Sequence, residues 1–499
     1  MSTILIIPMA ILIIAGLVLL IWSFVEHIRC KGVYEEKHIG IAQSIFLIAL
    51  FVSAGIVVYL ALGKERSVTL FYLMNNIPIY FKIDEIGRWF VLIVTIVWLL
   101  VGIYSIRYLR HEGEQKRFLG FFLLVYSVLI GLDFSGNLVT LYLFYELMTL
   151  TSFPLVLHNG SKEAIMAALK YLFYSMAGAY MGLFGIFYLQ HMMGDLTFVA
   201  GGAIGRAFFD ENKALMLVAL FIMILGFAVK AGLCPLHAWL PTAHPVAPSP
   251  ASAVLSGIIV KSGVLAIIRV IFYLIGPEML RGTWVITVLL ILSLVTVFMG
   301  SLLAFREPVL KKRLAYSTVS QVSYILFGIF LLTPKALTGA LLQVAFHAIV
   351  KCGLFLVAGV FLYEHHVKRV DELVGIGRRM PVTLWSYTFL SLSLIGIPPM
   401  SGFVSKWFLA QGALVSGTGV FEIIGPIVLL VSALLTAGYL MPITMKGFFP
   451  GEEAASEKVK ETSLWMLVPI VVLTVLAFVL GVFPNGLIDY ADKIAALQW

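Results

Sequence analysis

Charged residues are scarce in this chain of 499 residues: they make up 12% of it, whereas 61% of the residues are hydrophobic. A soluble domain has roughly 25% charged and about 45–50% apolar residues, so this chain could not cover a surface that faces water. Disorder is excluded as well, because disordered chains are poor in these apolar residues. The composition indicates a polytopic membrane protein. The net charge of +8 then reflects loop bias, and we expect no nucleic-acid partner.

Cysteine is scarce too. Cys30, Cys234 and Cys352 show no C-x-x-C spacing, whereas an iron–sulfur cluster needs about four thiolates. No glycine-rich nucleotide loop follows a predicted strand. We therefore expect no cofactor, no metal site and no catalytic residue, so that any electrons would travel in other subunits. The apolar N-terminus lacks a basic leader and a cleavage site, which predicts a first membrane helix there.

Long apolar runs are what the sequence has in abundance. A helix needs roughly 20 apolar residues to cross a bilayer core about 30 Å thick, and about fourteen segments reach that length. The predicted spans are 3–25, 39–62, 86–107, 117–134, 137–157, 164–190, 214–247, 249–275, 283–304, 313–331, 336–362, 384–415, 420–445 and 463–485. Ser67 to Lys82 alternates apolar and polar residues around Asn75-Asn76, which predicts an extramembrane β-hairpin. Asp195 to Lys213 is expected to lie at the interface.

The distribution of basic residues predicts the orientation. Loops after odd-numbered spans hold about 17 Lys and Arg, whereas loops after even-numbered spans hold about seven. Basic loops stay in the cytoplasm, so the odd loops are predicted to be cytoplasmic. Both termini would then lie outside an inner (plasma) membrane that the chain crosses many times.

Two predicted spans are too long and are interrupted. The seventh covers about 34 residues with Gly232 and Pro235 near its centre, and the twelfth covers about 32 residues around Gly396-Ile397-Pro398-Pro399. Interrupted helices at corresponding places in two halves indicate inverted repeats and an ion path at the midplane. Two proline kinks in long tilted helices are the alternative.

The fold class predicted is thus an all-α polytopic membrane protein with about 14 transmembrane helices. It has two inverted five-helix repeats and discontinuous helices 7 and 12. The corresponding division is an N-terminal part with three helices and the hairpin, two repeats (helices 4–8 and 9–13) and a C-terminal helix 14, at 1–114, 115–275, 283–445 and 463–485.

Several ionisable side chains lie near the middle of predicted spans, at the depth of the bilayer centre. They are Glu146, Lys230, Lys261, His347, Lys351 and Lys406. A charge at the bilayer centre costs about 2.5–3.5 kcal/mol even on a lenient scale, so such residues usually mark an ion or proton path. The alternatives are a structural Glu146–Lys230 pair, a core histidine at 347, and a Lys406 that merely binds carbonyls freed by the break.

Three further groups lie near span ends. His237 and His244, where the seventh span ends, are candidates for the lining of a vestibule. Arg269 and Lys170 are expected to be interfacial anchors.

Lysine suits a proton relay for a physical reason. Desolvation disfavours its charged form, and a nearby carboxylate favours that form again, so moving the carboxylate loads or unloads the lysine. Histidine adds a group that can pass a proton between its two nitrogens.

At these residues the chain resembles the antiporter-like subunits of respiratory complex I, the Mrp sodium/proton antiporters, and the membrane-bound hydrogenases and formate hydrogenlyases. The matching stretches are Leu141–Leu147, Lys230–Pro241, Pro248–Ala253 leading to Lys261, Lys312–Gln321, His347–Lys351, and Gly396–Phe403 leading to Lys406. The resemblance implies 14 helices with inverted repeats. It also implies that Glu146 pairs with Lys230, that Lys261 relays, and that Lys406 leads to the exit.

The resemblance implies a membrane subunit that translocates protons, with sodium as the alternative ion. It implies no enzyme activity of the chain on its own, and it implies that the chain works with other membrane subunits and lipid. Several lysines with few carboxylates make a poor cation cage, which favours protons. Two other hypotheses stay open. A stand-alone transporter for an organic solute would show a large pocket at the breaks, and a structural subunit would carry charges that only hold helices together.

Overall fold

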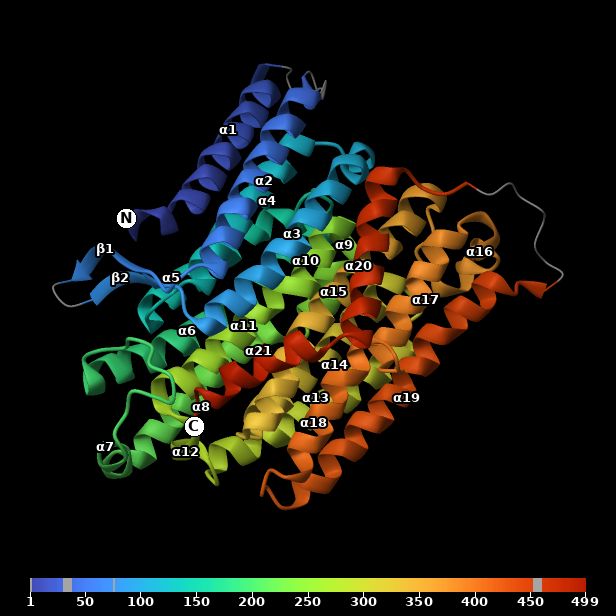
Figure 1. The fold of residues 1–499 in the computed structure, drawn as a ribbon. Coiled ribbons are helices and arrows are strands. Elements are labelled where there is room, and N and C mark those ends of the chain that lie inside the picture. The colour runs from blue at the N-terminus through green and yellow to red at the C-terminus, as the bar shows by residue number, and fades with distance from the viewer. Residues whose placement is uncertain (1, 30–37, 75–76, 452–459) are drawn as a thin grey trace.

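The structure is a computed structural model that describes residues 2–29, 38–74, 77–451 and 460–499. Within them, twelve helices are long and apolar enough to cross a membrane. The protein is thus an all-α, multi-pass membrane protein. Its long helices lie side by side in one elongated bundle (Figure 1).

The N-terminal part begins with a short helical turn, Ser2–Leu5, followed by two long helices, a hairpin and a third helix. These elements are α1 (Ile7–Arg29), α2 (Ile39–Leu62), β1 (Ser67–Met74), β2 (Ile77–Lys82) and α3 (Glu85–Glu112). The strands are antiparallel, with Ser67 opposite Lys82, which confirms the predicted hairpin. Asn75 and Asn76 lie outside the described residues, as does Cys30.

The middle of the chain holds the first interrupted span. Its elements are α4 (Gln115–Asp133), α5 (Leu138–Val156), α6 (Lys162–Met193), α7 (Arg206–Glu211), α8 (Lys213–Ala231), α9 (Leu240–Val246), α10 (Ser249–Val254) and α11 (Val260–Ile268). Two π-helical segments, Leu255–Ile259 and Arg269–Ile275, flank α11, and α12 (Pro277–Leu280) follows them. The short helix α7 lies in the loop where the sequence predicts an interfacial segment.

The last part holds the second interrupted span. Its elements are α13 (Trp284–Arg306), α14 (Leu310–Phe330), α15 (Pro334–His365), a 3₁₀ turn (Val370–Leu373), α16 (Ile376–Arg379), α17 (Pro381–Ile395), α18 (Ser401–Leu414), α19 (Val420–Phe448), α20 (Leu464–Val482) and α21 (Asn485–Ala496). The helix α14 and the pair α17–α18 run in the same bundle. Together with the twelve long helices they correspond to the fourteen predicted spans. The sequence analysis did not anticipate α21.

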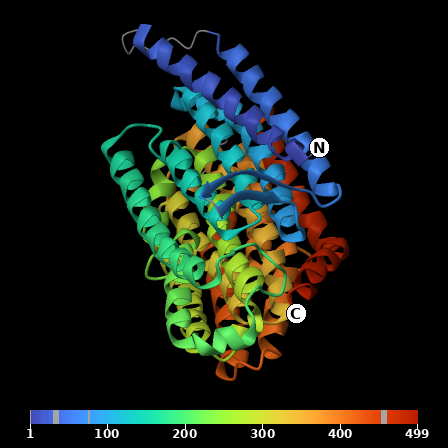
Figure 2. The ribbon, with the colours of Figure 1, turned by 90° about the vertical axis from the view of Figure 1, so that its left-hand side faces the viewer.

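The loops fall on two opposite faces. On one face the hairpin, the 194–205 loop and the C-terminus are tied together, because the backbone of Lys82 bonds to Phe134, that of Val199 to Tyr273, and that of Gly201 to the Gln498 side chain. Both termini lie at this end of the bundle (Figure 1), and Figure 2 shows the hairpin in front of the helices there. On the other face the basic loops meet, since Leu310 bonds to Lys368 and Gly375 to Lys446.

Arg269 is completely buried and is therefore not an interfacial anchor. Both terminal nitrogens of its guanidinium donate to the carboxylate of Asp84, which also caps α3 by accepting a bond from the Gly87 amide. The guanidinium lies 4.8 Å from the ring centre of Tyr273. The carboxylate offsets the cost of burying this cation, and the pair ties the 249–275 span to the start of α3.

Two spans, 249–275 and α15, are enclosed by other helices over their whole apolar length. They carry Lys261, His347 and Lys351. These three side chains thus lie in the interior of the protein, away from lipid.

Candidate intramembrane ion pathway

Glycines interrupt both broken spans. The helix α8 ends at Gly232 with φ 77°, and α17 ends at Gly396 with φ 91°. A positive φ suits glycine because it has no Cβ to clash. The discontinuities predicted for helices 7 and 12 are confirmed. The interruptions expose backbone carbonyls that need donors, and a side chain supplies one at each break.

At the first break the Trp239 indole donates to the Val229 carbonyl at 2.9 Å. At the second, the Lys406 ammonium donates to the carbonyls of Leu394 (2.7 Å) and Ile395 (2.8 Å). Lys406 therefore makes the carbonyl contacts expected of a lysine that only binds the groups freed by the break. It also lines a small cavity next to His347, so these contacts are compatible with a role in an ion path.

Lys230 lies in the last turn of α8, completely buried. Its ammonium donates to Thr149 Oγ1 (2.6 Å), Ser175 Oγ (3.1 Å) and Tyr171 OH (3.4 Å). It also lies 5.3 Å from the ring centre of Tyr145. Hydroxyls and aromatic rings from α5 and α6 thus solvate this charge.

Glu146 is half-buried on α5, one turn before Thr149. Among the described residues, no ion pair of 4.0 Å or less joins it to Lys230, and its Oε1 is buried without a hydrogen-bond partner. The pairing implied by the resemblance is therefore open in this conformation. Lys230 contacts the same helix as Glu146, but its ammonium donates to Thr149, one turn further along.

Lys261 and His347 are in direct contact. The Lys261 Nζ lies 2.5 Å from His347 Nδ1 and 3.0 Å from the carbonyl of Ser256. That carbonyl belongs to the π-helical segment that precedes α11, where the ordinary helical hydrogen bonds are displaced. Since a hydrogen bond needs one donor and one acceptor, at least one of these two bases is neutral.

The side chain of Lys351, one turn after His347 on α15, contacts α14. Its ammonium donates to the carbonyl of Leu314 at 3.0 Å and to the hydroxyl of Ser317. The Leu314 carbonyl also accepts from Thr318, which is 2.6 Å from the hydroxyl of Ser256. A chain of polar groups therefore connects the surroundings of Lys351 with those of Lys261.

A narrow cavity separates His347 from Lys406. Both line it, together with Gln321, Gln343 and Ser393, and it has room for about one water molecule. The His347 Nε2 is buried without a protein partner among the described residues. The second nitrogen of the imidazole is thus available on the side away from its bond to Lys261.

The two vestibule candidates differ. His237 is half-buried in the non-helical turn between α8 and α9. His244 is completely buried, stacks on Phe355 with ring centres 4.8 Å apart, and has no partner for either ring nitrogen in the described part of the chain. The residues that follow it, Pro245 to Ala247, line a cavity of about 670 Å³ at the face where the basic loops meet.

That cavity also takes in Glu112, Glu163 and Lys311, and the Lys311 ammonium donates to the carbonyl of Ala247 at 2.6 Å. Sequence reasoning did not single out Lys311 as a pathway residue, because it belongs to a cluster that looks like an ordinary basic loop. It also missed the hydroxyls around Lys230 and the glutamines of the narrow cavity. Polar residues of these types are common in membrane helices and carry no signal until the helices are packed.

A multi-pass bundle with two interrupted helices and a buried row of lysines defines the class of ion-translocating membrane subunits. Within that class the chain matches the family described as "NADH:quinone oxidoreductase/Mrp antiporter, TM" over residues 135–436. Residues 73–119 match "NADH-Ubiquinone oxidoreductase (complex I), chain 5 N-terminus". The chain belongs to this family of antiporter-like membrane subunits, which confirms the resemblance of its motifs.

Individual relatives agree with this assignment. NADH-quinone oxidoreductase subunit N of Desulforudis audaxviator is 33% identical, over 84% of this chain and 84% of that protein. Hydrogenase-4 component B of Escherichia coli is 29% identical, over 83% of this chain and 64% of that protein. A chain of the Mrp complex from Dietzia sp. DQ12-45-1b has the same fold, with a TM-score of 0.83 at 22% identity, over 100% of this chain and 97% of that one.

The contacts of Lys351 lead to a prediction about stability. Its ammonium is buried and no carboxylate pairs with it among the described residues, so Lys351→Met removes an expensive charge and keeps an unbranched side chain that is one atom shorter. We expect the thermal unfolding midpoint in detergent to stay unchanged or to rise. Lys116→Met is the matched control, because Lys116 is buried and pairs with Glu26 at 2.5 Å, and it should lower the midpoint by several degrees. A large loss of stability in Lys351→Met would favour a structural role for this lysine.

Proposed function

We propose that this chain is the proton-translocating subunit of a multisubunit membrane complex, and that protons move along Lys230, Lys261, His347, Lys351 and Lys406. The observation that carries the proposal is the 2.5 Å contact between Lys261 and His347 inside helices that lipid does not reach. Two bases that share one hydrogen bond can exchange a proton without moving a heavy atom far. Grotthuss-type relay then needs water only at the remaining gaps.

The histidine gives the row its continuity. A proton received at Nδ1 from Lys261 can leave as the Nε2 proton into the narrow cavity, where a single water would reach Lys406. Lys406 in turn lies at the interruption between α17 and α18, where the carbonyls of Leu394 and Ile395 stabilise its charged form. The cavity of about 670 Å³ that Lys311 and Pro245 to Ala247 line, next to His244, is the vestibule of the path on the face with the basic loops. His237 lies in the turn at the first break.

Glu146 acts as the gate in this proposal. When Glu146 moves within ion-pair reach of Lys230, the ammonium is stabilised, and when the two separate, as in this conformation, only hydroxyls hold it. The half-buried position of Glu146 on α5 places it where a neighbouring subunit could shift it. The family's complexes would supply such neighbours.

Protons fit the row better than sodium does. Sodium, as a hard cation, is bound by oxygen ligands, and the row contributes four lysines, one histidine and a single carboxylate. Driving energy and any electron transfer would come from partner subunits, because the chain has no catalytic activity of its own in this proposal. The division into helices 1–3 (1–114), two inverted repeats (115–275 and 283–445) and helix 14 (463–485) belongs to the same proposal.

The two other hypotheses are disfavoured by particular observations. A transporter of organic solutes needs a pocket at the breaks, whereas the cavity beside Lys406 has room for about one water. A structural subunit needs its buried charges paired, as Arg269 is with Asp84, whereas Lys261 and Lys351 bond to carbonyls, a hydroxyl and an imidazole.

Glu146→Gln tests the gate. The amide keeps the size and polarity of the side chain but cannot change the charge near Lys230, so we expect coupled proton transport to fall at least tenfold while the complex still assembles. Acidification of inverted membrane vesicles, followed with a pH-sensitive dye, measures transport, and native gels measure assembly. If assembly is lost and the residual complex transports normally, Glu146 is a structural residue.

Lys406 tests the exit with three substitutions. Lys406→Ala removes the protonatable group and should abolish transport. Lys406→Arg keeps a cation that can donate to the Leu394 and Ile395 carbonyls but does not release its proton, so it should fold normally and also fail to transport. Lys406→Glu can relay protons and should retain part of the activity. Full transport by Lys406→Arg would contradict a relay through this position.

We also propose that the face with the basic loops is cytoplasmic and that both termini lie outside. In a variant whose native cysteines are replaced by serine, Arg378→Cys should be protected in intact cells from a thiol reagent that does not cross membranes. Glu211→Cys, exposed at the end of α7 in a loop on the opposite face, should react with it. The reverse pattern would invert the topology.

A further inference from the structure

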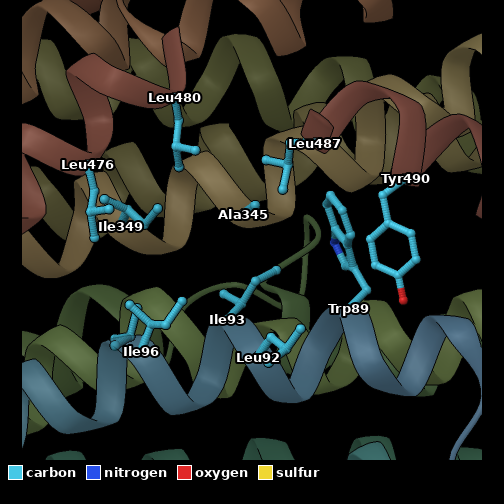
Figure 3. A pocket seen from close by; sticks show the side chains of 11 residues that line it. Trp89, Leu92, Ile93, Ile96, Ala345, Ile349, Leu476, Leu480, Leu487 and Tyr490 are labelled. Carbon is cyan, nitrogen blue, oxygen red and sulfur yellow. The ribbon is translucent and has the colours of Figure 1, made fainter. Parts of the chain in front are cut away.

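A largely apolar pocket lies far from the row of lysines. It is formed by α3, α15, α20 and α21, elements widely separated in the chain, and its volume is about 240 Å³. One water needs about 10–15 Å³ on the same measure. Apart from Trp89 and Tyr490 at one end, its walls are aliphatic. Figure 3 shows leucine and isoleucine side chains from these helices around an elongated space.

The end with the two aromatic rings is polar. Trp89 is 3% exposed, and its indole nitrogen is buried without an acceptor in the described part of the chain. Figure 3 shows that nitrogen on the side of the pocket, turned away from Tyr490. The Tyr490 hydroxyl donates to the Glu85 carboxylate at 2.7 Å, and Lys493 pairs with the same carboxylate at 3.0 Å. A buried N–H without an acceptor is costly, which points to a ligand that supplies an oxygen here.

We propose that this pocket binds one acyl chain of a membrane phospholipid, whose ester carbonyl accepts the hydrogen bond from the Trp89 indole. Trp89 lies one turn inside the end of α3, at the level where aromatic residues meet the headgroups. From Trp89 to Ile96 the wall of α3 runs about 10 Å into the hydrocarbon at 1.5 Å per residue. The pocket thus has a polar mouth at the interface and apolar walls at acyl-chain depth.

The charges near the mouth fit a phospholipid headgroup. Arg88 and Lys493 both lie beside Glu85, and Lys493 is 59% exposed. They would attract a phosphate at the surface while the acyl chain enters below. A quinone would need polar groups around its ring, and the side chains that line the pocket offer a single buried donor. A partner helix, about 10 Å wide, would not fit this volume.

The pocket also lies behind the proton row. Ala345 and Ile349 form its wall on α15, and each is two residues before a member of the row, His347 or Lys351. Two residues are about 200° around a helix, so the acyl chain would lie on the face of α15 opposite the row. A bound lipid would therefore support the helix that presents both groups, whether or not the row conducts protons.

Photo-crosslinking tests the proposal. The chain, in its complex and in a mild detergent, is stripped of loosely bound lipid and exposed to a phosphatidylglycerol with a diazirine in its acyl chain. We expect labelled peptides from 89–97, 345–349 and 476–487, at about one lipid per chain. Uniform labelling of lipid-facing helices such as α6 and α19 would overturn the proposal, and so would a native mass spectrum showing a quinone in place of the lipid.

Two pairs of variants keep the result interpretable. Ala345→Phe fills the pocket and should lower labelling of these peptides several-fold, whereas Ala177→Phe, on the exposed face of α6, should not. Trp89→Phe keeps the ring but removes the donor and should weaken lipid retention about two- to tenfold, the usual range for one hydrogen bond. Trp385→Phe, 52% exposed, is its control. Unchanged labelling in well-folded Ala345→Phe and Trp89→Phe would refute the site.

Discussion

A positive charge inside a bilayer must be solvated by the protein itself, and the arrangement of this bundle follows from that constraint. Lys230, Lys261, Lys351 and Lys406 are held by hydroxyls, carbonyls and an imidazole, and none of their hydrogen-bond partners in the described part of the chain is a carboxylate. Backbone carbonyls that lack a helical partner become available where a helix is interrupted or widened, whereas Lys351 shares the Leu314 carbonyl of the regular helix α14. The glycine break between α17 and α18 and the π-helical segment before α11 supply such carbonyls for Lys406 and Lys261. Helix irregularity and buried charge therefore occur together for a physical reason.

The sequence was sufficient to predict the spans, the two breaks, the hairpin and the presence of ionisable residues inside the bundle, because each has a strong local signal. Span length, glycine and proline in an overlong apolar run, and a lysine far from either end are all properties of one short segment. The four-residue spacing of His347 and Lys351 also predicts that both project from one side of a helix. The inverted relation of the repeats stays a prediction, as do the roles of the individual side chains.

What the sequence did not predict depends on contacts between distant segments. Thr149, Tyr171 and Ser175 surround Lys230 only after α5, α6 and α8 pack together. Glu146 is one turn away from Thr149 on the same helix, and no spacing rule distinguishes which of them bonds to the lysine. The expectation for Arg269 failed for the same reason: its partner, Asp84, is 185 residues away in the chain. The apolar pocket is lined by residues of α3, α15, α20 and α21, so no pattern within a single segment of the sequence could predict it.

Arg269 and Lys261 show how one helical segment can carry two kinds of buried charge. Arg269 has a bidentate carboxylate partner and a guanidinium that stays protonated, so its charge is fixed and holds α3 against the 249–275 span. Lys261, eight residues earlier, has a neutral carbonyl and an imidazole as partners, so a base that could accept its proton lies next to it. If a carboxylate replaced the imidazole, Lys261 would have a fixed counter-charge like that of Arg269, and the proposed relay would be lost. In the proposed path, a mobile proton requires that the lysines have no permanent counter-charge. Glu146, the one carboxylate of the row, accordingly forms no ion pair with Lys230 among the described residues.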